Sequence, residues 1–333
     1  MSPSLSVVIP AKNEADGLRT FLPRLRALLP DAEIIVVDDG STDDTAAVAT
    51  AAGARALCSP YSMGNGAAIK RGARAASGEV LVFMDADGQH DPADIALLLA
   101  KLDEGYDMVV GARDRGGQAN VGRSLANGLY NFIASWMTNF AVCDLTSGFR
   151  VARADAFREF LHLLPNGFSY PTTITMAFLR SAFPVAYVPI KVAKRIGRSH
   201  LKPLRDGVRF LLIIFKIATL YSPLKLFAPT AFAFFLTGIS YYGYTYVTIN
   251  RFTNMSAVLL IYSLSLFLIG LVSEQISALH YKGVEEDQRR TRRDEPHRWT
   301  TPLLYRTATG QDPSTDSRSA GVSSVLREEV EDR

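Results

Sequence analysis

The sequence predicts an α/β domain built on a mostly parallel sheet, followed by an amphipathic helix and two membrane-spanning helices. Short apolar runs alternate with helical segments over residues 1–200, which is typical of a parallel sheet covered on both faces. Polar clusters follow directly on several of these runs. Farther along, residues 226–250 and 252–273 contain no Asp, Glu, Lys or Arg, as expected of helices in a bilayer.

The alternation is regular along the first half of the chain. Apolar runs predict strands at residues 5–10, 33–37, 54–58, 80–83 and 108–111. Apolar spacing and start signals predict helices at residues 13–29, 41–52, 67–76 and 93–102. Two further helices are expected at residues 161–165 and 169–182, and an edge strand with two prolines at residues 183–190.

The strand at residues 80–83 leads into the densest polar cluster of the chain. Asp85, Asp87, Gln89 and Asp91 follow it, and ligands of open α/β sheets bind where the strands end. Asp85 and Asp87 are two residues apart, so both carboxylates can reach one hard cation, and oxygen ligands of this kind suit Mg²⁺ or Mn²⁺. The alternative is a solvated acidic turn in which Asp91 caps the next helix.

Composition excludes some classes of protein and leaves others open. Lys and Arg number 36 against 33 Asp and Glu, a net charge of +3 that does not indicate a nucleic-acid partner. The isolated cysteines Cys58 and Cys143 are expected to be buried free thiols. Gly64 and Gly66 lack the third glycine of a dinucleotide-binding loop, so we interpret them as close packing of a helix on the sheet.

Six motifs in fixed order carry a resemblance to a known family: VVIPAKNE, VVDDGSTDDT, GNGAAIKRG, DADGQHDP, GAR and TSGFR. Over residues 5–200 the chain resembles family 2 glycosyltransferases of the GT-A fold, in particular the polyprenyl-phosphate branch typified by dolichyl-phosphate mannose synthase. The resemblance implies inverting transfer of one sugar from a UDP- or GDP-hexose to a dolichyl- or undecaprenyl-type phosphate, with Mg²⁺ or Mn²⁺ as cofactor.

The same resemblance implies roles for individual residues. The nucleotide-sugar would be bound by Pro10, Lys12, Glu14, Val37, Asp39, Asp85, Ala86, Asp87, Arg113, Lys194 and His200. The metal would be bound by Asp85, Asp87 and Gln89, and the lipid phosphate by Arg113, Arg123 and Ser124. The catalytic residues would be Asp87, Arg113 and Arg123. The sequence departs from the family at four positions: Lys12 stands where Tyr is common, Gly88 where Leu is common, Lys194 where Arg is common, and His200 where Lys is common.

A phosphate acceptor changes what the site must do. Because it is already an anion, it needs no general base, whereas a sugar hydroxyl would. Arginine pairs bidentately with phosphate oxygens, so Arg113 and Arg123 suit the two phosphate-bearing substrates. For Arg150 two interpretations stay open: a role in the site, or a structural ion pair with Asp144.

The last third of the chain is expected to anchor the protein in the lipid bilayer. The two charge-free segments would span roughly 37 and 33 Å as helices, enough for a hydrocarbon core of about 30 Å. Basic residues flank the pair, so the positive-inside rule places both termini and the catalytic domain in the cytoplasm, at a prokaryotic plasma membrane or the endoplasmic reticulum. Residues 204–221 predict an amphipathic helix in the headgroup plane, which with residues 194–200 would form a lid.

These expectations divide the chain into four parts: a GT-A domain (1–200), the interfacial helix (201–222), two spanning helices (223–281) and a charged tail (282–333), expected to be disordered beyond Gly283.

The expected partners are a nucleotide-sugar, polyprenyl phosphate and the bilayer, and homo-oligomerisation stays open. The alternatives are a polysaccharide or glycolipid transferase with a hydroxyl acceptor, a nucleotidyltransferase, and a membrane scaffold without catalysis. A processive synthase would need a QxxRW-like motif and more spanning helices, which the sequence lacks.

Overall fold

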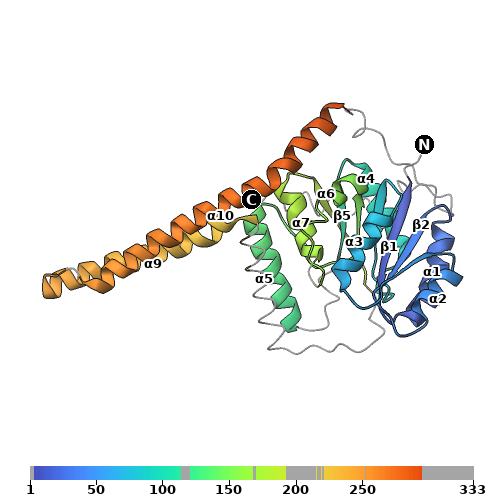
Figure 1. Cartoon of the computed structure of the whole chain (residues 1–333), viewed down its shortest axis with the longest axis horizontal. Coiled ribbons are helices and arrows are strands. Elements are labelled where there is room, and N and C mark those ends of the chain that lie inside the picture. Colours follow the sequence, from blue (N-terminus) through green and yellow to red (C-terminus); the bar gives the residue numbers. More distant parts are fainter. Residues whose placement is uncertain are drawn as a thin grey trace.

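A computed structural model describes residues 4–113, 121–167, 170–192, 215, 219, 221–251 and 253–294. For residues 121–127, 129, 130 and 280–294 it describes the backbone alone. An α/β domain occupies the first part of the chain, and a long pair of helices extends from it (Figure 1).

The domain is organised around one seven-stranded sheet. Its strands are β1 (Leu5–Ala11), β2 (Glu33–Asp38), β3 (Arg55–Cys58), β4 (Val80–Phe83), β5 (Met108–Arg113), β6 (Arg150–Arg153) and β7 (Val185–Ile190). Their order is β3-β2-β1-β4-β6-β5-β7, and every neighbouring pair is parallel except those made by β6, which runs antiparallel to β4 and β5. The mostly parallel sheet is therefore confirmed, with β7 at an edge as predicted. Strand β6 is not predicted, because its sequence RVAR gives no apolar run.

Helices cover both faces of the sheet. They are α1 (Ala15–Leu28), α2 (Thr45–Ala51), α3 (Asn65–Ala75), the 3-10 turn η1 (Pro92–Asp94), α4 (Ile95–Asp103), α5 (Val121–Thr138), α6 (Ala154–Glu159) and α7 (Tyr170–Arg180). Alternate residues of β1 face opposite sides: Val8 packs in one buried cluster, and Val7 and Ile9 pack in the other. The helix predicted at residues 161–165 is wrong: that stretch forms turns, although Leu161 and Leu164 are buried at helical spacing.

Two expectations about small residues need correction. A Cβ on Gly66 would lie 2.0 Å from the carbonyl oxygen of Pro165, so Gly64 and Gly66 allow a loop, not the sheet, to approach α3. The glycine that brings α3 onto the sheet is Gly72, whose added Cβ would lie 2.3 Å from Val8 Cγ1. Both cysteines are exposed, not buried, since β3 lies at the sheet edge and Cys143 lies in a surface segment.

The C-terminal helices α9 (Pro223–Ile249) and α10 (Asn254–Asp294) form a hairpin. Asn250 ends α9 in the left-handed conformation (φ 52°), and Ser263 Oγ donates across the pair to the carbonyl of Ala231 (2.8 Å). A Cβ on Gly270 would lie 2.7 Å from Phe227 Cβ, so a small residue here permits close helix packing.

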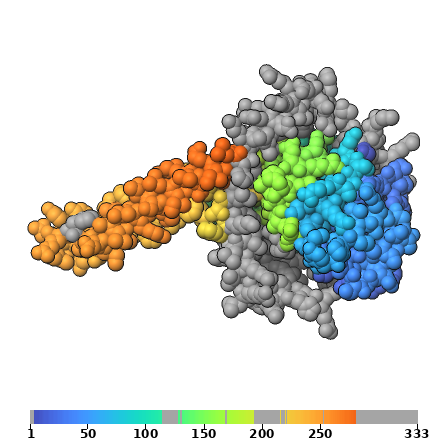
Figure 2. Space-filling view, in the orientation of Figure 1, coloured from blue at the N-terminus to red at the C-terminus, as the bar shows by residue number. Residues whose placement is uncertain are grey.

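The hairpin stands clear of the domain (Figure 2). It presents apolar side chains outward. Its segments Pro223–Ile249 and Asn254–Leu279 are long and apolar enough to cross a membrane. A core helix of a soluble domain would be mostly buried, whereas Phe232, Val247 and Leu264 are at least 60% exposed.

Helix α10 continues to Asp294, past Gly283, where the sequence predicts disorder to begin. The predicted interfacial helix (204–221) lies almost entirely outside the described residues, and the predicted lid (194–200) wholly outside them.

Candidate active site at the carboxyl edge of the sheet

The loops that follow β1 and β2 are joined by hydrogen bonds. The backbone N–H of Asn13 donates to Ser41 Oγ (2.9 Å), Asn13 Oδ1 accepts from the N–H of Thr42 (2.8 Å), and the N–H of Glu14 donates to Thr45 Oγ1 (3.1 Å). Asn13 has φ 54°, a left-handed conformation that Asn tolerates better than most residues. The turn therefore holds Lys12, which is exposed, and Glu14, which is half-buried, at fixed places on the edge.

The predicted nucleotide-binding residues of β1 and β2 differ in how accessible they are. Pro10 is half-buried near the end of β1, whereas the side chain of Val37 is fully buried in the core. Asp39 is 5% exposed and accepts from Ser62 Oγ (2.7 Å), the N–H of Met63 (2.7 Å) and the N–H of Gly64 (2.9 Å). Asp39 thus organises the loop before α3.

The acidic cluster lies at the end of β4, as predicted. Asp85 lies against Gly148, where an added Cβ would be 2.7 Å from Asp85 Oδ2. Ala86 is buried, and its carbonyl oxygen packs against Gly17 of α1, where an added Cβ would be 2.7 Å away. Asp87 Oδ1 accepts from the N–H of Gln89 (3.2 Å). These contacts fix the turn that carries the two carboxylates.

The backbone conformation at position 88 explains why a glycine stands there. Gly88 has φ +67°, a region that costs an L side chain energy and that glycine adopts freely. The turn therefore favours glycine where the family commonly has leucine. Asp87, Gly88 and Glu14 line a cleft of about 390 Å³, so the structure brings residues from the ends of β1 and β4 to one opening.

The oxygen ligands at this turn fit a divalent cation. Within the described part of the chain, no three His, Cys, Asp or Glu side chains are close enough to share one metal ion. The protein's predicted contribution stays the carboxylates of Asp85 and Asp87 and the amide of Gln89, which lie on the one turn after β4. Mg²⁺ is commonly held by one or two carboxylates together with substrate phosphates, and this set matches that pattern.

His90 lies beside the cluster as a neutral ring. It is 7% exposed and stacks on Phe149 with ring centroids 5.0 Å apart. Burial lowers the pKa of His90 to about 4, although the charge of Asp87 opposes the shift. His90 therefore adds no positive charge to compete with a cation at neutral pH.

Arg113, at the end of β5, forms an ion pair with Asp144. Its Nε lies 2.8 Å from Asp144 Oδ2 and its Nη2 lies 3.0 Å from Oδ1, and Nη2 also donates to Thr146 Oγ1. The hydrogen bond with Asp144 raises the pKa of Arg113, and the nearby charge of Asp85 adds to that shift. Burial alone would raise the pKa of Asp144, but the hydrogen bonds and charge of Arg113 hold it below its ordinary value.

The ion pair with Asp144 is thus made by Arg113, and Arg150 has other partners. Arg150 is fully buried and donates to the carbonyls of Pro171 (3.1 Å) and Ser147 and to Thr175 Oγ1 (3.2 Å). These bonds hold the segment before β6 against α7. The sequence suggests Asp144 only as a partner of Arg150, so its pairing with Arg113 is not predicted. The contact of Gly148 with Asp85 is not predicted either, although the TSGFR motif pointed to this segment.

The remaining predicted residues are less fully placed. Arg123 and Ser124 lie in the first turn of α5, where the structure describes only the backbone. Lys194 and His200 lie outside the described residues. The roles of all these residues, and of those placed above, stay predictions.

Comparison with known proteins agrees with this architecture. Residues 6–161 match the family model described as glycosyl transferase family 2, and residues 222–279 match the GtrB C-terminal hairpin. An undecaprenyl-phosphate 4-deoxy-4-formamido-L-arabinose transferase of Pseudomonas fluorescens is 32% identical over 250 residues, covering 69% of this chain and 68% of that protein. The polyprenol monophosphomannose synthase of Mycolicibacterium smegmatis is 29% identical over 236 residues, covering 64% and 84% of the two chains.

A solved structure shows the same fold. Glucosyl-3-phosphoglycerate synthase from Mycobacterium tuberculosis, in complex with Mn²⁺ and UDP-glucose, superposes with a TM-score of 0.52 at 26% identity, covering 65% of this chain and 78% of that one. The sheet, the acidic turn and the appended hairpin define a glycosyltransferase of the GT-A fold with two C-terminal apolar helices. The chain belongs to glycosyl transferase family 2, in its polyprenyl-phosphate branch.

Proposed function

We propose that this protein transfers a single hexose from a UDP- or GDP-sugar to polyprenyl phosphate at the cytoplasmic face of a membrane. The observation that carries the proposal is the presence, in one chain, of two carboxylates at the end of β4 and an exposed apolar hairpin. The first suits a nucleotide diphosphate with its cation, and the second brings the site to a lipid acceptor. The similarity to a polyprenol monophosphomannose synthase supports the same reaction.

The chemistry is a direct displacement that inverts the anomeric carbon. An oxygen of the acceptor phosphate forms a bond to that carbon as the bond to the nucleoside diphosphate breaks. Asp85, Asp87 and Gln89 would hold a divalent cation, which would neutralise the departing diphosphate. No base is required, because the acceptor carries no proton that must be removed.

The protein's own task is to bring two anions together. Arg113, oriented by Asp144 beside Asp85, supplies a fixed positive charge at the same edge. Preorganised charges of this kind stabilise a transition state without reorganising during the reaction. Arg123 and Ser124, at the start of α5, are the proposed contacts for the lipid phosphate.

The orientation follows from the positive-inside rule. Basic residues flank the hairpin on the side of the domain, so the domain and both termini would lie in the cytoplasm.

The test is to incubate purified full-length protein in lipid nanodiscs with polyprenyl phosphate and a panel of radiolabelled UDP- and GDP-sugars. The expected result is a lipid-extractable sugar from one donor, with release of the nucleoside diphosphate. Release of pyrophosphate would indicate a nucleotidyltransferase. Transfer to a hydroxyl acceptor but not to polyprenyl phosphate would contradict the proposal, as would the absence of nucleotide-sugar binding.

A further inference from the structure

We propose that Lys225, at the start of the membrane hairpin, is a positioning residue that holds the Arg113–Asp144 pair of the active site in place. The inference rests on the proposed function, because it concerns how the site of that reaction is tied to its membrane anchor. Helix α5, which meets the hairpin where the hairpin leaves the domain, connects the two (Figure 1).

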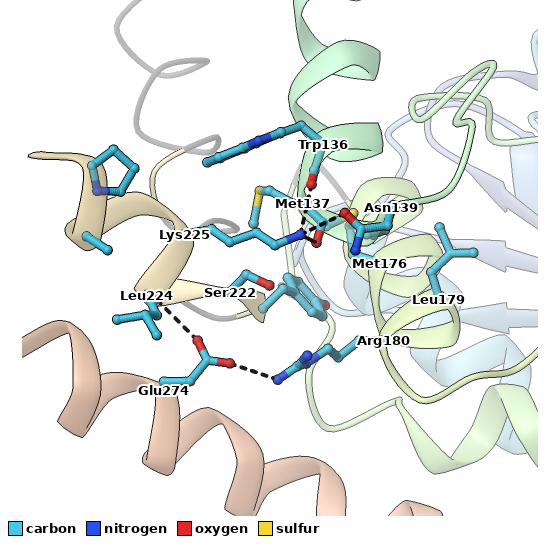
Figure 3. A pocket seen from close by; sticks show the side chains of 14 residues that line it. Trp136, Met137, Asn139, Met176, Leu179, Arg180, Ser222, Leu224, Lys225 and Glu274 are labelled. Atoms are coloured by element: carbon cyan, nitrogen blue, oxygen red, sulfur yellow. Dashed lines mark hydrogen bonds and ion pairs between the residues drawn. The ribbon is translucent and has the colours of Figure 1, made fainter. Parts of the chain in front are cut away.

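Lys225 caps the C-terminal end of α5. Its ammonium group donates to the carbonyls of Trp136 (3.0 Å) and Met137 (3.1 Å) and to Asn139 Oδ1 (3.0 Å), as Figure 3 shows. The last carbonyls of a helix lack partners within the helix and carry partial negative charge. A lysine has three N–H donors, so Lys225 uses all of them on the end of this one helix.

The opposite side of the same junction is fixed by separate contacts. Glu274 of α10 accepts from Arg180 Nη2 (3.0 Å) and from the backbone N–H of Leu224 (3.2 Å) (Figure 3). Tyr221 is buried, and its hydroxyl donates to the carbonyl of Thr173 (2.7 Å). These contacts join the hairpin to α7 and do not involve α5, so Arg180 offers a matched control.

The last turns of α5 in turn hold the segment that leads to the active site. Asn131 Nδ2 donates to the carbonyl of Cys143 (2.6 Å), and Asn131 Oδ1 accepts from the N–H of Leu145 (3.1 Å). Ser135 Oγ accepts from the N–H of Val142 (3.0 Å). Residues 142–145 are therefore fastened to α5 by three hydrogen bonds.

Asp144 lies within this fastened segment. Its carboxylate receives Nε and Nη2 of Arg113 and also the backbone N–H of Arg113 (3.2 Å). Each step from Lys225 through α5 and residues 142–145 to Arg113 is thus a contact between described residues. If α5 loses its cap, the segment can shift, and a displacement of about 1 Å at a reacting group can cost on the order of 100-fold in rate.

The first test uses amide hydrogen exchange as a direct probe of the segment. The N–H groups of Val142 and Leu145 are bound to Ser135 Oγ and Asn131 Oδ1 of α5, and the N–H of Met63, far along the chain, is bound to Asp39. In full-length protein in nanodiscs, Lys225→Met should raise the exchange rates of Val142 and Leu145 about fivefold, because local opening breaks these hydrogen bonds, while Met63 exchanges at the wild-type rate. Lys225→Arg should restore slow exchange, and Arg180→Met should leave it slow. Unchanged exchange of Val142 and Leu145 in Lys225→Met would overturn the proposal.

The second test is a double-mutant cycle on turnover with polyprenyl phosphate. Lys225→Met should lower kcat/KM about tenfold, and adding it to Asp144→Asn should cost less than about twofold more, because residues acting through one network are not additive. Arg180→Met with Asp144→Asn should be additive. Full additivity of Lys225→Met with Asp144→Asn would contradict the inference. If the wild-type protein made no lipid-linked sugar, the proposed function would fail, while hydrogen exchange of Val142 and Leu145 would still decide the role of Lys225.

Discussion

Arg113 and Asp144 form a two-point ion pair at the edge of the candidate active site, with Nε 2.8 Å from Oδ2 and Nη2 3.0 Å from Oδ1. The carboxylate is almost wholly buried and the guanidinium is about one-third exposed (34%). The pair orients the guanidinium of Arg113. Of the two arginines that we propose for the substrate phosphates, Arg113 is the one whose side chain the structure describes. The pair also ties a segment between α5 and β6, which has little regular structure, to the end of β5.

Replacing Asp144 with Asn should destabilise the domain by about 1.5–3 kcal/mol, the range for hydrogen bonds to charged groups. Chemical denaturation in detergent measures the change. Because the pKa of Asp144 is depressed in the folded state, the pair stabilises the protein above the ordinary value of about 3.9 and loses this effect as the pH falls through the folded-state pKa. The difference between wild type and variant should be constant from about pH 8 to pH 5 and shrink below about pH 4. A difference that grew on acidification would contradict this role.

Asp87→Asn should reduce sugar transfer by at least about 100-fold, the typical cost of removing one electrostatic stabiliser of a transition state. Asp91→Asn is the matched control. Asp91 accepts from the N–H of Ala93 as the cap of η1 and pairs with Arg24, so its loss should cost about 1 kcal/mol of stability and leave most of the turnover. Radiolabelled lipid product measures both variants. Equal losses would show that the acidic turn acts only as a structural cap.

Gly72→Ala should destabilise the protein by about 1–3 kcal/mol, the usual cost of overpacking a core. The new methyl would lie 2.3 Å from Val8 Cγ1, and this clash outweighs the gain of about 1 kcal/mol in helix propensity. At Gly128 in α5, no described atom lies within 4 Å of an added Cβ, so Gly128→Ala should be neutral or stabilising. Thermal unfolding midpoints test the pair, and a stable Gly72→Ala protein would show that α3 can move off the sheet.

Arg123→Ala should impair use of the lipid acceptor more than binding of the donor. An arginine contact to phosphate is charge-assisted and worth several-fold to about 100-fold in affinity, so the KM for polyprenyl phosphate should rise by about that factor. The Kd of the nucleotide-sugar, measured by calorimetry, should stay within about twofold. Equal weakening of both substrates would refute the role assigned to Arg123.

The sequence predicts the sheet and the acidic turn well, because each depends on local patterns. The buried run Val80–Phe83 and the carboxylates that follow it are adjacent in the chain, so strand and site are predicted together. Strand β6 escapes prediction since its pairing with β4 and β5 is decided by the fold and not by apolar periodicity.

The partner of Arg113 escapes prediction for a similar reason. Asp144 lies 31 residues away from Arg113, and nothing local distinguishes it from a partner for Arg150. Likewise, the contacts of Lys225 with Trp136 and Met137 join residues almost ninety positions apart. Long-range contacts between polar groups leave no periodic signal in the sequence.

The measurement that tests the central claim most directly is lipid glycosylation after removal of divalent cations. Purified full-length protein, polyprenyl phosphate and the preferred nucleotide-sugar are combined after exhaustive chelation, and the extracted lipid is counted with and without added Mn²⁺ or Mg²⁺. We predict that chelation abolishes transfer and that the added cation restores it, because Asp85 and Asp87 alone would repel the diphosphate. Transfer at the full rate in chelated samples would contradict the account.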